Sequence, residues 1–167
     1  MIEGWHEFYL LVGTSAAALT GLMFVVISIS PETIAERPKA GVRAFVTPTM
    51  VFFTTALGVS ALMLVPHLAP VPLAALLALT SVAGIAYLLW AQGQYHLRAQ
   101  KLDAEDWVFF IGLPFLSYVL LLAAAVAIWR GSALGAPMLA FATLLLLVVG
   151  IHNAWDLVIW LAQQRRK

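Results

Sequence analysis

The 167-residue chain has no cysteine and few charged residues, and each absence excludes classes of protein. Without cysteine there are no disulfides, thiolate metal sites, iron–sulfur clusters or cysteine nucleophiles. Charged residues make up 10% of the chain and hydrophobic residues 63%, which reverses the balance of a water-soluble domain. The net charge is +1 and no basic stripe occurs, so nothing indicates nucleic acid as a partner.

Charge is missing altogether from five long stretches of the sequence. Each stretch has 23 residues or more without Asp, Glu, Lys or Arg, whereas a helix that crosses a bilayer needs about 20 apolar residues. The stretches are 8–30, 44–66, 68–94, 107–129 and 131–155.

This pattern predicts an all-α integral membrane protein with a five-transmembrane-helix bundle. Residues 1–167 form a single transmembrane domain in this prediction, and the lipid bilayer is its first partner. The connections are about a dozen residues at most, too short for a nucleotide-binding or protease domain. The predicted helices span about 5–30, 43–66, 70–96, 106–129 and 134–162.

The distribution of positive charge predicts how the helices are threaded. The start of the chain carries Glu3 and Glu7 but no Lys or Arg, which is atypical of a cleaved signal peptide, so we expect a permanent first helix. Of the nine Lys and Arg residues, eight fall on one side of a five-helix topology, and only Arg130 falls on the other. Positive loops stay in the cytoplasm, so the N-terminus is predicted outside and the C-terminus inside.

Small residues and prolines predict how the helices pack. Gly13, Ala17 and Gly21 repeat every four residues and clear one face for another helix, either within the subunit or in a homo-oligomer. Three prolines in 66–72 predict a tight external turn that makes the helices at 43–66 and 70–96 antiparallel neighbours. Pro114 is expected to bend the helix at 106–129.

One cluster of polar residues lies at the predicted outer end. Glu3, His6 and Glu7 share a helical face, and His67 ends the next helix on the same side. Carboxylates and imidazoles are suitable ligands for a zinc- or iron-class metal or for a proton relay. The alternative is an ordinary interfacial helix start, in which the acids complement the helix dipole. No particular cofactor is indicated.

A second cluster lies toward the predicted cytoplasmic end. His152 and Asp156 are four residues apart and can meet on one face, with Asn153 beside them, and a carboxylate within lipid needs a partner. The pattern fits either a structural ion pair at the interface or a site for permeation or proton transfer. Candidate partners for the acid from other helices are Arg43, His96 and Gln92.

The sequence contains no recognisable arrangement for catalysis. It has no Ser-His-Asp grouping, no glycine-rich phosphate loop and no His-Glu-x-x-His motif, so a membrane-embedded enzyme is the third interpretation. The leading one is a multi-pass protein of a bacterial inner membrane whose homo-oligomer gives a small ion or solute a path or a site, as a channel or transporter does. The alternative is a non-transporting accessory protein of a larger membrane complex.

Overall fold

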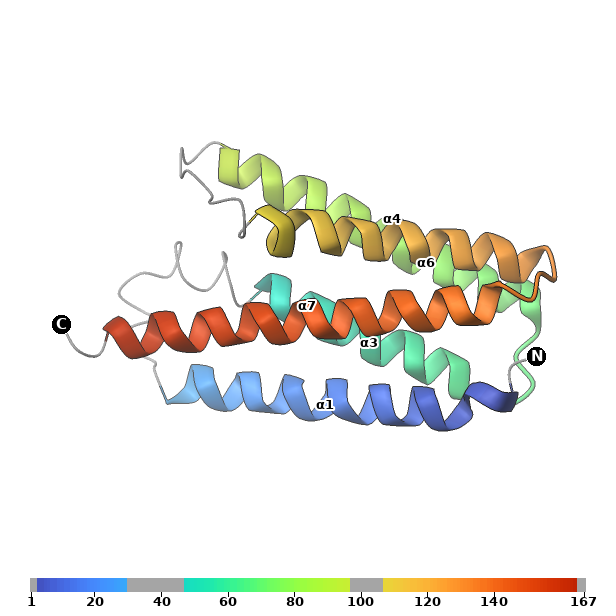
Figure 1. The fold of residues 1–167 in the computed structure, drawn as a ribbon, viewed down its shortest axis with the longest axis horizontal. Helices are drawn as coiled ribbons and strands as arrows, with labels where there is room; N and C mark the ends of the chain where they lie inside the picture. The colour runs from blue at the N-terminus through green and yellow to red at the C-terminus, as the bar shows by residue number, and fades with distance from the viewer. Residues whose placement is uncertain (1–2, 30–46, 97–106, 165–167) are drawn as a thin grey trace.

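A computed structural model of the chain describes residues 3–29, 47–96 and 107–164, and within these ranges every regular element is helical. Figure 1 shows the helices lying along one common long axis. The elements are the 3₁₀ turn η1 (Glu3–Trp5), α1 (His6–Ser28), α3 (Thr47–Leu64), α4 (Pro70–His96), the π-helical turn η3 (Val108–Gly112), α6 (Leu113–Trp129) and α7 (Gly135–Gln164).

Five of these helical segments are long and apolar enough to cross a membrane, which confirms the predicted helical class. The charge-free stretches form helices because a long apolar run satisfies its backbone hydrogen bonds internally. Large apolar side chains also cover much of the outer surface, among them Leu11, Leu79 and Trp155. A surface of this kind is suited to lipid rather than to water.

The helices pack in the spatial order α4, α6, α7, α3, α1, with α1 also touching α7. In Figure 1, α4 and α6 lie together above α7, while α1 lies below it and α3 behind. The helices on either side of the 66–72 turn run antiparallel, as predicted, but they are not the close neighbours that the turn predicted. α3 and α4 have few contacts with each other, and α4 packs along α6 instead.

Interactions around Tyr118 explain why α4 packs along α6. Gly84 of α4 leaves room for the Tyr118 ring, because a Cβ atom there would lie 2.1 Å from the Tyr118 Cε1 atom. The Ser81 hydroxyl donates to the Tyr118 carbonyl at 2.6 Å, and the Tyr118 hydroxyl lies 3.0 Å from Thr55 Oγ1 of α3. This buried side chain holds α4 against α6 and links both to α3.

Two other glycines allow close contact between α7, α3 and α1. A Cβ atom at Gly150 of α7 would lie 2.5 Å from the ring of Phe53 in α3. A Cβ atom at Gly13 of α1 would lie 3.0 Å from the Cβ atom of Ser60, also in α3. These contacts hold α3 between α1 and α7, around a core in which Phe53 and its apolar neighbours are buried.

Candidate functional site

A short segment of α7 carries three polar side chains, His152, Asn153 and Asp156. His152 Nε2 lies 3.7 Å from Asp156 Oδ2, and the side chains are 26% and 34% exposed. The α-helical register brings residues four apart onto one face, so this pair forms within a single helix. The arrangement places an imidazole and a carboxylate together, two groups that can bind or pass on a proton.

The imidazole of His152 also packs against the π-helical turn η3. Its ring centre lies 3.7 Å from that of Phe109, and the two planes are inclined by 52°. η3 is π-helical because the Leu113 N–H donates to the carbonyl of Val108, five residues back. The next residue, Pro114, has no N–H to donate. Pro114 directly follows this π-helical turn, which places Phe109 against His152, and the bend expected at Pro114 stays a prediction.

Asn153 occupies the neighbouring position on α7 but faces the interior. Its side chain is 0% exposed, and neither its amide nitrogen nor its amide oxygen has a hydrogen-bond partner among the described residues. Gly150, one turn away, packs against Phe53. Since α3 runs antiparallel to α7, Asn153 lies at the level of the first turn of α3.

The partners predicted for Asp156 from other helices fall outside the described side chains. Arg43 lies in a part of the chain that the structure does not describe. The backbone of Gln92 and His96 belongs to α4, which ends at His96, but the side chains of both lie outside the description. The pairing of Asp156 with another helix therefore stays a prediction, while its pairing with His152 is present.

The outer cluster does not gather into a metal centre within the described part of the chain. No group of three or more His, Asp and Glu side chains is found there, and the side chain of Glu3 is not described. His6 and Glu7 are exposed in the first turn of α1. His67 is exposed in the turn after α3, with a φ of 56°, and it lines a pocket together with His6.

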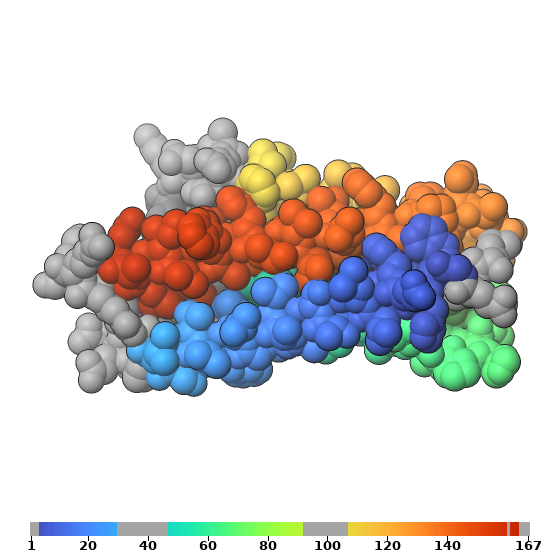
Figure 2. Space-filling view, turned by 60° about the horizontal axis from the view of Figure 1, so that its bottom comes forward, coloured from blue at the N-terminus to red at the C-terminus, as the bar shows by residue number. Residues whose placement is uncertain are grey.

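The small-residue face of α1, formed by Gly13, Ala17 and Gly21, lies partly inside the bundle and partly on its surface. Gly13 is buried against Ser60 of α3, so this part of the face serves packing within the subunit. Ala17 and Gly21 are exposed, and a Cβ atom at Gly21 would meet nothing within 4 Å. Figure 2 shows α1 lying beside α7, with much of the α1 surface uncovered.

Sequence reasoning found His152 and Asp156 but missed the buried state of Asn153 and the contact with Phe109. Pro114 predicted a bent helix, but not the π-helical turn or the side chain that it presents to His152. No family model, curated protein or solved structure matches this chain. The proposed function therefore rests on the residues themselves, chiefly on His152, Asn153 and Asp156, which together form the α7 site.

Proposed function

We propose that the protein is a multi-pass membrane protein that binds a small ion or solute at His152, Asn153 and Asp156. Asn153 is the observation that carries this proposal, because a fully buried amide with no partner among the described residues lies beside an imidazole–carboxylate pair. A buried polar group without a hydrogen bond costs about 1–3 kcal/mol. A guest that donates to the amide oxygen or accepts from its nitrogen would offset that cost.

Distances along α7 support a site near the cytoplasmic boundary of the bilayer. Asp156 follows Gly135 by 21 residues, which is about 32 Å of helix. A hydrocarbon core is about 30 Å thick, so an α7 that enters at Gly135 brings Asp156 to the opposite boundary. His152 and Asn153 then lie one turn deeper. A charged guest would meet the carboxylate at the water boundary and the amide inside.

The remaining features of the proposal rest on the sequence and on the exposed helix faces. The charge asymmetry supports an external N-terminus and a cytoplasmic C-terminus. The small size of the chain and its short loops are the grounds for proposing a bacterial inner membrane. The exposed part of the small-residue face of α1, at Ala17 and Gly21, supports a homo-oligomer, because small residues let helices approach closely in lipid. The same face favours a second candidate function, that of an accessory subunit packed against another membrane protein.

The substitution Asn153→Leu tests the proposed site, because leucine has a similar volume and no polar atoms. If the amide binds a guest, flux of H⁺, Na⁺ or K⁺ into dye-loaded proteoliposomes should fall several-fold. The thermal midpoint should meanwhile rise or stay the same, because the unpartnered amide is gone. Leu146→Met, a buried change elsewhere on α7, is the control and should leave flux unchanged. Unchanged flux in Asn153→Leu, from a wild type that conducts, would refute the transport site. A wild type without flux would favour the accessory function.

A further inference from the structure

A pocket lies at the other end of the bundle from the α7 site. It has a volume of about 430 Å³ and is lined by His6, residues 62–68 and Leu73. It therefore lies between the start of α1, the end of α3 and the start of α4, at the end predicted to be external. Its volume is in the lower part of the range for small-molecule sites.

The walls of this pocket combine apolar side chains with a few polar groups. Leu62, Met63, Val65, Leu68 and Leu73 supply the apolar surface. The imidazoles of His6 and His67 are the polar side chains, and they come from segments about 60 residues apart in the sequence. A ligand for this pocket therefore needs an apolar body and a polar group.

The end of α3 favours a positive charge on that polar group. The last carbonyls of a helix have no partner within it and form the negative end of its dipole. Val65 donates its N–H to the Leu62 carbonyl, and Pro66 has no N–H to donate. In the described structure, the carbonyls of Met63 and Leu64 accept no backbone hydrogen bond from the turn that follows.

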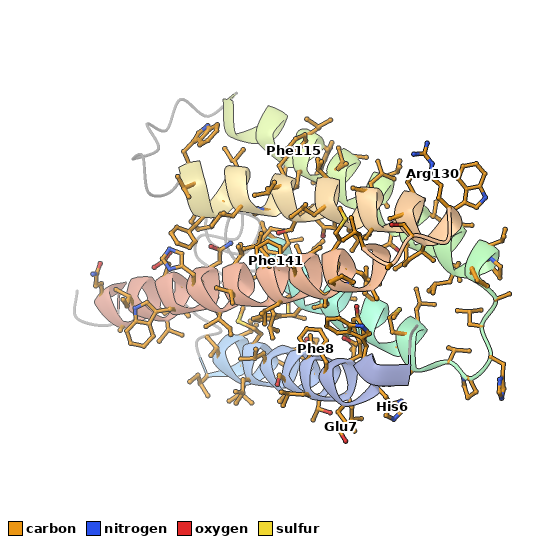
Figure 3. The ribbon with its side chains drawn as sticks, turned by 45° about the vertical axis from the view of Figure 1, so that its right-hand side comes forward. His6, Glu7, Phe8, Phe115, Arg130 and Phe141 are labelled. Atoms are coloured by element: carbon orange, nitrogen blue, oxygen red, sulfur yellow. The ribbon has the colours of Figure 1, made fainter. Side chains whose placement is uncertain are left out.

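The surroundings of the pocket favour the same sign of charge. The positive end of α4 is short of donors, because Pro70 and Pro72 have no N–H and Leu73 donates to Ala69. The acidic Glu7 lies next to His6 in the chain. Figure 3 shows Arg130 at the same end of the bundle but on the side away from His6 and Glu7.

We propose that this pocket binds a small organic ammonium ion with an apolar body. The ammonium group donates to the free carbonyls at the end of α3 and to the imidazoles, while the apolar body packs against the leucines and Met63. An anion of the same shape would face the negative end of a helix and a neighbouring carboxylate. This site is separate from the α7 site in place and in chemistry.

Three probes of similar shape and different charge test the proposal: benzylammonium, benzoate and benzyl alcohol. Binding is measured by saturation-transfer NMR and calorimetry on the full chain in nanodiscs, with empty nanodiscs subtracted. We expect saturable binding of benzylammonium, weaker binding of benzyl alcohol and none of benzoate. Benzoate binding as tightly as benzylammonium would overturn the proposal. The proposal would also be overturned if all three probes gave binding signals no larger than those from empty nanodiscs.

Two substitutions then locate the binding site. Leu68→Trp fills the pocket and should abolish benzylammonium binding, whereas Leu79→Trp, on the exposed face of α4, should not change it. His6→Phe keeps a ring but removes the acceptor, and it should weaken binding several-fold. His6 is exposed, so this variant should fold even if Leu68→Trp does not. Wild-type affinity in His6→Phe, or in a folded Leu68→Trp, would overturn the proposal. Asp156→Asn should leave benzylammonium binding unchanged.

Discussion

The ring of His152 in α7 rests on the ring of Phe109 in η3, with 3.7 Å between their centres. This contact joins the polar face of α7 to the one π-helical turn in the described chain. π-helical turns often occur at functional sites, since they shift the register of a helix and redirect its side chains. Here the turn packs against an imidazole that also lies 3.7 Å from the carboxylate of Asp156. A movement of η3 would therefore displace the His152 side chain of the proposed binding site.

The contact between Gly84 and Tyr118 predicts a large effect of a small substitution. Gly84→Ala places a methyl group about 2 Å from a buried ring, and such overpacking costs about 1–3 kcal/mol. We expect a clearly lower thermal midpoint in detergent. Gly58→Ala is the matched control, because a Cβ atom there meets nothing within 4 Å and alanine favours the helix. Equal midpoints for the two variants would contradict the close packing of α4 on α6.

The exposed part of the α1 face predicts an effect on assembly. Ala17→Leu adds bulk where a second copy would approach, so we expect the assembly in nanodiscs to dissociate, as measured by native mass spectrometry. Ala83→Leu makes the same change on the exposed surface of α4 and should leave the assembly intact. A wild type that is monomeric, or an Ala17→Leu variant with unchanged mass, would rule out this face as a homo-oligomer interface.

The fold was partly predictable because one physical requirement determines much of it. A long stretch without charge must form a helix in lipid, and α4 begins and ends at the predicted residues, 70 and 96. The order of the helices in space was not predictable in the same way. The tight turn at 66–72 indicated that α3 packs on α4, but Gly84 and Ser81 match Tyr118 on α6 instead. Such complementarity depends on side-chain shape, which helical periodicity does not encode.

The candidate site was predictable to a similar extent. The spacing of His152 and Asp156 identified a pair that meets within one helix, because that contact needs only the helical register. The burial of Asn153 depends on where α3 lies, and the contact with Phe109 depends on the π-helical turn. Both are tertiary features, so neither could be read from the spacing of residues along α7.

The charge asymmetry makes a prediction about topology that is independent of the site. Met1 should be external and Lys167 cytoplasmic, because eight of the nine positive residues would then face the cytoplasm. The chain has no cysteine, so single cysteines introduced near each end can be labelled without background. A membrane-impermeant maleimide should label the first and not the second in intact cells. Labelling of both ends would refute the five-helix topology.

The last prediction separates a binding role for Asp156 from a structural one. Asp156→Asn keeps the shape of the side chain but removes its charge, and a partly exposed imidazole–carboxylate pair contributes at most about 1 kcal/mol. We therefore expect normal assembly and a nearly unchanged thermal midpoint, together with a several-fold fall in ion or proton flux in proteoliposomes. Gln163→Glu, an exposed change farther along α7, is the control for a general effect of charge. If assembly and midpoint fall along with flux, Asp156 is a structural partner of another helix. If flux stays at the wild-type level, the carboxylate has no part in permeation, and the α7 site would then rest on Asn153 alone.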